Sequence, residues 1–287
     1  MDQPKRRRFR PFRGVRPARA ATVAGTEPSA PKPRSRGVYI LPNAFTTANL
    51  FAGFYAIVQA MNGRFEAAAV AIFVAMVLDS LDGRVARLTN TQSAFGEQYD
   101  SMSDMVSFGA APALVIYEWS LRGMGKLGWL AAFVYCAGAA LRLARFNTNI
   151  GVVDKRFFQG LPSPAAAALV AGLVWISTDL RETRWIDATG TDLRWLAWTV
   201  TVYAGVTMVS NAPFYSFKDV NLKKSVPYMV VPLIVLAFVL VSSDPPIVLF
   251  SLFLVYAVSG YVLQLLRWRA GRPAPVRTPG PPPPPSN

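Results

Sequence analysis

This chain has no histidine and contains a single cysteine, Cys136, among its 287 residues. Without histidine, a proton-transferring group must be a carboxylate, a Lys, a Tyr or water, which favours an Asp as any base. A lone cysteine cannot form an internal disulfide bond and gives no information on the redox compartment. Charge is scarce too, because charged residues make up 16% of the chain against 52% hydrophobic residues. This balance excludes an ordinary soluble globular protein and indicates a polytopic membrane protein.

Apolar segments recur along most of the chain and predict an all-α, polytopic membrane helix bundle with about eight transmembrane helices. The second helix should continue past the membrane edge through Arg87, and Pro245-Pro246 should separate the last two. The predicted spans are residues 39–60, 65–79, 96–119, 127–145, 160–178, 196–214, 226–241 and 247–268.

The basic residues are concentrated in the tail that precedes the first span. The chain has 30 Lys and Arg against 16 Asp and Glu. Next to a membrane span, a basic tail is typical of contact with anionic membrane lipid, and we expect no nucleic-acid partner. We predict that residues 1–36 form a disordered cytoplasmic tail and residues 270–287 a disordered proline-rich tail. The distribution of basic loops places both termini in the cytoplasm, which suggests a bacterial inner (cytoplasmic) membrane protein.

Four aspartates lie where the second and third spans meet. Asp79 and Asp82 are three residues apart, and Asp100 and Asp104 are four apart, so each pair shares one helix face. Four facing carboxylates repel one another unless a positive charge lies between them. An all-oxygen ligand set without Cys or His favours a hard divalent cation, Mg²⁺ or Mn²⁺. The alternative interpretation is a solvated acidic loop between helices.

Small residues and a basic residue accompany the four acids in a fixed pattern. The pattern is Asp79-x-x-Asp82-Gly83-x-x-Ala86-Arg87, eight further residues, and Gly96-x-x-x-Asp100-x-x-x-Asp104. It resembles the signature of the CDP-alcohol phosphatidyltransferase family, with every fixed position filled. Pro42-Asn43-x-x-Thr46 also resembles the family's first-helix motif, which lines the nucleotide site. The resemblance implies a six-helix core within a transmembrane catalytic domain of residues 37–269.

The resemblance also implies roles for these residues. Asp79 and Asp100 would bridge two metal ions, Asp82 would complete one site, and Asp104 would lie nearest the acceptor alcohol as ligand and general base. The nucleotide lipid would be bound by the remaining motif residues: Asn43, Thr46, Gly83, Ala86, Arg87 and Gly96. For the small residues the alternative is close helix packing, and for Arg87 it is a position at the cytoplasmic membrane edge.

Three further stretches resemble the phosphatidylserine synthase branch of the family. They are residues 104–109, residues 141–147 (LRLARFN) and residues 158–164 (FQGLPSP). The branch implies CDP-diacylglycerol and L-serine as substrates, and phosphatidylserine and CMP as products. Arg142 and Arg145 are three residues apart and could bind the serine carboxylate. Asn147 could bind the amino group or orient an arginine.

Several alternatives stay open from the sequence alone. The acceptor could instead be glycerol 3-phosphate or an inositol phosphate, and Arg142 and Arg145 could simply mark the positive-inside end of a helix. A divalent-cation transporter would also carry intramembrane acids, although it should have them near mid-depth. A scaffold that recruits partners through its tails is a third option. Small residues at 137–140, together with the family's tendency to dimerise, favour a homodimer.

Overall fold

The computed structural model describes residues 40–89, 93–148, 157–182, 190–215 and 230–270. Both predicted tails lie outside these residues, apart from Ala270, so their disorder stays a prediction. Much of the basic loop sequence used to predict the orientation, including residues 149–156 and 216–229, also lies outside them.

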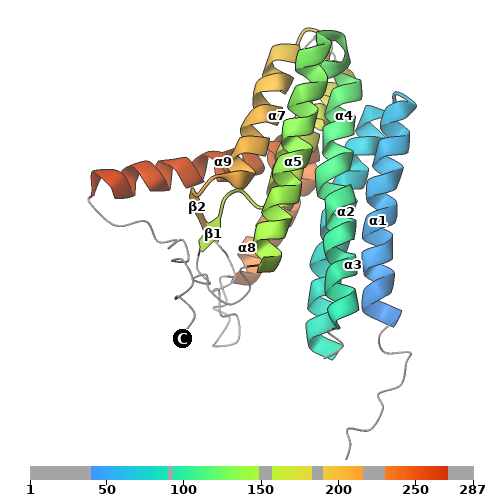
Figure 1. The fold of residues 1–287 in the computed structure, drawn as a ribbon, viewed down its shortest axis with the longest axis vertical. Coiled ribbons are helices and arrows are strands. Elements are labelled where there is room, and N and C mark those ends of the chain that lie inside the picture. Colours follow the sequence, from blue (N-terminus) through green and yellow to red (C-terminus); the bar gives the residue numbers. More distant parts are fainter. Residues whose placement is uncertain (1–39, 90–92, 149–156, 183–189, 216–229, 271–287) are drawn as a thin grey trace, which may run out of the picture. The chain divides into compact units, whose positions relative to one another are not determined.

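Nearly all of the described chain is helical (Figure 1). The helices are α1 (Ile40–Met61), α2 (Phe65–Thr89), α3 (Ala94–Asp104), α4 (Ala111–Trp119), α5 (Lys126–Thr148), α6 (Ser163–Glu182), α7 (Arg194–Val209), α8 (Val230–Ser243) and α9 (Pro245–Arg269). Each predicted span has a helical counterpart, although the helix that corresponds to the sixth span, α7, ends at Val209 rather than at residue 214. Pro245 does begin α9, where Asp244 Oδ1 caps the helix by accepting from the Ile247 amide at 3.2 Å.

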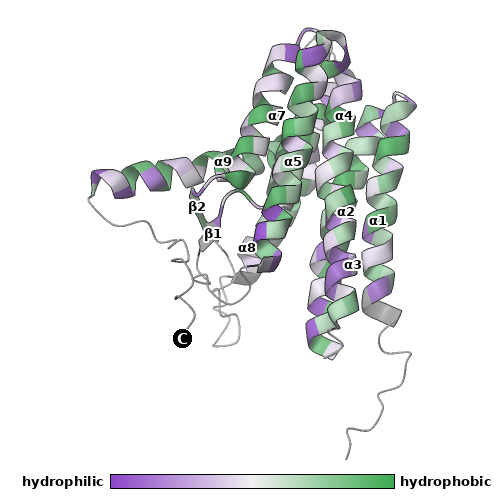
Figure 2. Cartoon of the chain, viewed as in Figure 1, coloured by the Kyte–Doolittle hydropathy of each residue, from purple (hydrophilic) through white to green (hydrophobic). Residues whose placement is uncertain are grey.

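The predicted class, an all-α membrane helix bundle, is confirmed. Within the described residues, four helices are long and apolar enough to cross a membrane: α1, α5, α6 and α9. Figure 2 shows hydrophobic residues along most of α1 and α5, with hydrophilic residues gathered towards helix ends. The chain is therefore an integral membrane protein, while the total of eight spans stays a prediction.

Small residues let the helices approach closely. Ala56 and Ala60 of α1 and Ala68 of α2 are buried, and these two helices pack together. Between α5 and α7, a side chain on Gly138 would overlap the Gly205 carbonyl oxygen. Such contacts between small residues are the usual way in which membrane helices gain van der Waals contact without a hydrophobic driving force.

The structure departs from the predicted third span in one turn. The segment Met105–Ala110, which follows Asp104, is π-helical and joins α3 to α4. Tyr135 of α5 donates a buried hydrogen bond to the Phe108 carbonyl of this turn at 3.0 Å. π-helical turns in α-helices often occur at functional sites, and their wider hydrogen-bond pattern leaves no signal in hydrophobic periodicity.

The predicted sixth span, residues 196–214, is wrong at its end. Helix α7 stops at Val209, and Pro213–Tyr215 forms strand β2, which pairs antiparallel with strand β1 (Phe157–Gln159). Pro213 has no amide hydrogen for a helix and would clash with its preceding turn. After β1 the chain turns at Gly160, whose φ of 79° favours glycine.

Candidate active site

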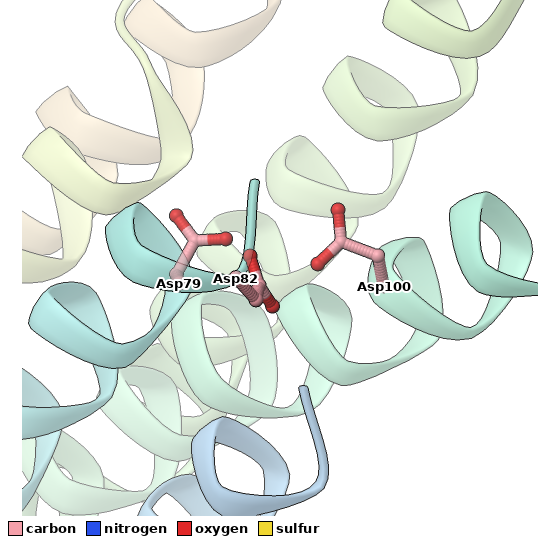
Figure 3. Close-up of side chains that lie close together, drawn as sticks. All are labelled: Asp79, Asp82 and Asp100. Carbon is pink, nitrogen blue, oxygen red and sulfur yellow. The ribbon is translucent and has the colours of Figure 1, made fainter. Parts of the chain in front are cut away.

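Three of the four aspartates converge between α2 and α3. One carboxylate oxygen each from Asp79, Asp82 and Asp100 lies within 4.8 Å of the other two. Figure 3 shows the three side chains directed towards a common space, the first two from α2 and the third from α3. Asp104 lies one turn further along α3 and interacts electrostatically with Asp79 and Asp100.

No described Lys or Arg forms an ion pair with these carboxylates. Burial raises the pKa of Asp82 above its usual value, against the lowering effect of its hydrogen bond from Thr46. Asp100 Oδ1 is buried and has no hydrogen-bond partner among the described residues. Acids this close, one buried and two half-buried, with an unsatisfied oxygen on Asp100, fit the ligand set of a hard divalent cation.

Helix α1 orients two of the acids. Thr46 Oγ1 donates to Asp82 Oδ2 at 3.0 Å, and Asn49 Nδ2 donates to Asp104 Oδ1 at 3.2 Å. Both donors are buried, at 4% and 0% exposure, so water does not compete for these bonds. Outer hydrogen bonds of this kind fix the orientation of carboxylate ligands.

The backbone of α1 is fastened to the same region. Ser103 Oγ donates to the Thr46 carbonyl at 3.1 Å, and Ser107 Oγ donates to the Asn49 carbonyl at 3.0 Å. A side chain on Gly53 would overlap Ser107, whose Cα would lie 2.6 Å from the added Cβ. The position of the acids therefore depends on close packing of α1 against α3 and the π-helical turn.

Among the residues predicted to bind the nucleotide lipid, Gly83 faces open space. A Cβ placed on it would meet no atom within 4 Å, and the residue is exposed. Close helix packing therefore does not explain this glycine, and its role in binding the nucleotide lipid stays a prediction. Ala86, one turn along α2, is partly buried. Arg87 is exposed, and its Nε donates to the Gly83 carbonyl at 2.9 Å within the same helix.

The other two predicted nucleotide residues meet between α1 and the start of α3. Asn43 Oδ1 would lie 3.6 Å from a Cβ on Gly96, so the two residues are neighbours. Ser93 caps α3 by accepting from the Gly96 amide at 3.0 Å. The cap fixes where α3 begins and thereby the angular position of Asp100, four residues on.

The three predicted acceptor residues have different surroundings. Arg142 Nη1 donates to Ser163 Oγ of α6 at 2.8 Å, while its Nε is buried without a hydrogen-bond partner in the described part of the chain. Arg145 Nη1 donates to Asn211 Oδ1 at 3.4 Å in exposed surroundings. Asn147 Nδ2 donates to Ser101 Oγ at 3.1 Å, next to Asp100. Arg142 also interacts electrostatically with Asp104.

Sequence reasoning missed Asn49, Ser101 and Ser163 as partners of the site residues. A signal existed for Asn49, because it lies three residues after Thr46 and so shares its helix face. Ser163 falls inside the FQGLPSP stretch, but its partner could not be inferred from spacing. Ser101 had no signal, because its bond to Asn147 joins residues 46 positions apart.

Comparisons with known proteins match the part of the chain that contains these site residues. The model of the CDP-alcohol phosphatidyltransferase family matches residues 39–209. A Helicobacter pylori protein named CDP-diacylglycerol–serine O-phosphatidyltransferase is 34% identical over 231 residues, which cover 80% of this chain and 94% of the relative. A Mycobacterium leprae protein of the same name is 31% identical over 251 residues, covering 84% and 81%.

A third relative of that name, from Methanocaldococcus jannaschii, is 46% identical over a shorter stretch of 101 residues, 35% of this chain and 47% of the relative. The family match includes all four aspartates and the three acceptor candidates. With this match over more than half of its length, the chain belongs to the CDP-alcohol phosphatidyltransferase family.

Proposed function

We propose that this protein transfers the phosphatidyl group of CDP-diacylglycerol to L-serine, giving phosphatidylserine and CMP. The observation that carries the proposal is the cluster of Asp79, Asp82 and Asp100, together with Arg142, whose Nε is buried and has no hydrogen-bond partner among the described residues. The acids suit a diphosphate bound with divalent cations, and the guanidinium suits a carboxylate-bearing alcohol. The names of relatives that align over most of this chain support the same reaction.

In this reaction the serine hydroxyl oxygen forms a bond to the phosphorus that carries diacylglycerol. The bond from that phosphorus to the bridging oxygen of CMP breaks, and the hydroxyl proton passes to a base. Two divalent cations, Mg²⁺ or Mn²⁺, would neutralise the pyrophosphate and stabilise the leaving CMP. Asp79 and Asp100 would hold both ions, and Asp82, oriented by Thr46, would complete one site.

Asp104 is the proposed base and fourth acidic ligand. Asn49 donates to its Oδ1, which fixes the orientation of the carboxylate, and as the base Asp104 would accept the hydroxyl proton. Its distance along α3 from Asp100 is one helical turn, so the base lies beside the diphosphate site rather than within it.

The serine carboxylate would bind Arg142, which offers a buried Nε–H without a partner. An unsatisfied buried donor carries a desolvation cost that a bound carboxylate removes, which makes the site selective for acceptors with an anionic group. Asn147, held by Ser101, is the candidate for the serine amino group. Arg145 is bonded to Asn211 in exposed surroundings, so its proposed role is secondary.

The nucleotide would occupy the open space beside Gly83, bordered by Ala86, Arg87 and the Asn43–Gly96 contact. We also propose that the site and both termini face the cytoplasm of a bacterium, in its inner membrane, and that the protein is a homodimer. Labelling of introduced cysteines in intact cells and in inverted vesicles tests the orientation, and cross-linking in membranes tests the dimer.

The deciding experiment uses purified protein with CDP-diacylglycerol, Mg²⁺ or Mn²⁺ and a panel of acceptors. We expect CMP release with L-serine, and none above background with glycerol 3-phosphate, inositol phosphate or ethanolamine, which lacks the carboxylate. CMP release with a phosphorylated acceptor but not with serine would refute the serine assignment while leaving the reaction class intact.

A further inference from the structure

A hydrogen bond between two helices joins Arg142 of α5 to Ser163, the first residue of α6. Arg142 Nη1 donates to Ser163 Oγ at 2.8 Å. Ser163 is only 1% exposed, so water competes little for this bond. The position of the guanidinium therefore depends on where α6 begins.

This bond determines which edge of the guanidinium can bind an anion. In an arginine, Nη1 lies on the side of Cδ, whereas the Nε–H and one N–H of Nη2 point in parallel from the opposite side. The Nε of Arg142 is buried and has no hydrogen-bond partner among the described residues. With Nη1 bonded to Ser163, the edge that contains Nε is the one that a carboxylate can bind with two parallel hydrogen bonds.

The charge of Arg142 has no carboxylate partner in the described part of the chain. Arg142 is half-buried, and no described Asp or Glu forms an ion pair with it. Charged side chains that are partly removed from water are usually paired. The Ser163 hydroxyl satisfies one N–H of the guanidinium without neutralising it, which leaves the positive charge for an anionic group of a substrate.

The segment that carries Ser163 is fixed to the chain at the end of α7. The Gly160 amide donates to the Ala212 carbonyl at 2.9 Å, and the Leu161 amide donates to the Thr207 carbonyl at 3.1 Å. Directly before Gly160, strand β1 pairs with strand β2. These backbone bonds fix the start of α6, and with it the Ser163 hydroxyl.

We propose that Ser163 is a positioning residue for Arg142, which holds the guanidinium so that its Nε edge receives the carboxylate of the acceptor. The inference rests on the proposed function of Arg142 and adds a specificity-determining residue on α6. Because Ser163 acts through Arg142, its loss should weaken the binding of serine and spare the nucleotide lipid.

The test measures steady-state kinetics of the full chain in detergent micelles, with L-serine and CDP-diacylglycerol each varied in turn. Ser163→Ala removes only the hydroxyl. The loss of one hydrogen bond to a charged group predicts a rise of about tenfold in KM for serine, with kcat and KM for CDP-diacylglycerol within about twofold of the unaltered protein. Thermal unfolding of each variant shows whether it is folded.

Two further variants separate the role of this hydroxyl from a general effect on α6. Ser163→Thr keeps a hydroxyl at the position and should keep KM for serine within about threefold of the unaltered protein. Ser177→Ala is the matched control, because Ser177 lies on the same helix and its hydroxyl donates to the Leu173 carbonyl at 2.7 Å, a bond that does not involve Arg142. We expect its KM for serine to be unchanged.

The inference is overturned by a normal KM for serine in Ser163→Ala, by an equal rise in Ser177→Ala, or by a parallel rise in KM for the nucleotide lipid. An equal rise in a Ser163→Thr variant of unchanged Tm would also overturn it. If the unaltered protein does not use serine, the proposed function falls, and the inference falls with it. If the unaltered protein uses serine and Ser163→Ala does so with the same KM, only the role of Ser163 is refuted.

Discussion

Replacing Gly83 with alanine should make the protein more stable and a poorer enzyme. Gly83 lies inside α2 and is exposed, and a Cβ at this position meets nothing within 4 Å. Alanine is favoured over glycine in a helix interior by about 0.8–1 kcal/mol, because glycine loses more backbone freedom on folding. With no clash to offset this gain, we expect the Tm of Gly83→Ala to rise by about 2–4 °C.

The same methyl group should weaken nucleotide binding. If the open space beside Gly83 receives the cytidine of the substrate, an added methyl overpacks the complex, at a cost of about 1–3 kcal/mol. That cost corresponds to a rise of about 5- to 150-fold in KM for CDP-diacylglycerol. The assay combines thermal unfolding with and without CMP and steady-state kinetics in which the nucleotide lipid is varied. The KM for serine should stay close to normal.

Gly123→Ala is the matched control, because a Cβ on Gly123 also meets nothing within 4 Å but the residue lies in the short helical turn Leu121–Met124, on another segment of the chain. It should leave KM for the nucleotide lipid unchanged. An unaltered KM in Gly83→Ala would refute the assignment of this space to the nucleotide. A lower Tm in Gly83→Ala would contradict the finding that a Cβ on this residue of α2 meets no neighbouring atom.

Three further variants test other parts of the site and the fold. Thr46→Val removes the buried hydrogen bond to Asp82 and should lower the affinity for Mn²⁺, measured by electron paramagnetic resonance, by about 10- to 100-fold; unchanged affinity would show that Asp82 is not a ligand oriented from α1. Asp104→Asn should reduce turnover by about 10²- to 10⁴-fold while CDP-diacylglycerol still protects the protein in thermal unfolding, and near-normal turnover would exclude this residue as the base. Gly138→Ala places a Cβ on the Gly205 carbonyl, where the backbone cannot yield, and should destabilise the protein by about 1–3 kcal/mol; a Tm equal to that of the unaltered protein would contradict the close approach of α5 and α7.

Much of the site followed from residues close together in the sequence. The spacing of Asp79 and Asp82, and of Asp100 and Asp104, predicted two acidic helix faces, and the structure brings three of these acids to a common point. The helix bounds were also close to the predicted ones where apolar length and proline decide them, as at Pro245. The π-helical turn after Asp104 was missed, because one widened turn does not alter an apolar pattern.

The surroundings of the predicted acceptor residues could not be predicted from residue spacing. Arg142 and Arg145 are three residues apart, and helical periodicity treats them alike. In the structure one bonds buried Ser163 and keeps an unpaired Nε, whereas the other bonds exposed Asn211. The difference arises because Ser163 begins α6 and Asn211 follows α7, and the sequence around the two arginines does not indicate where these segments pack.

The sequence by itself determined the membrane class, the helices and the acidic pattern, because these depend on backbone periodicity and on the hydrophobicity of neighbouring residues. Only the tertiary structure decided which side chains hold the site in place. Thr46 meets Asp82 across 36 positions, and Asn49 meets Asp104 across 55. Contacts between distant segments depend on how whole helices pack, and that packing is a property of all the helices together rather than of any one stretch.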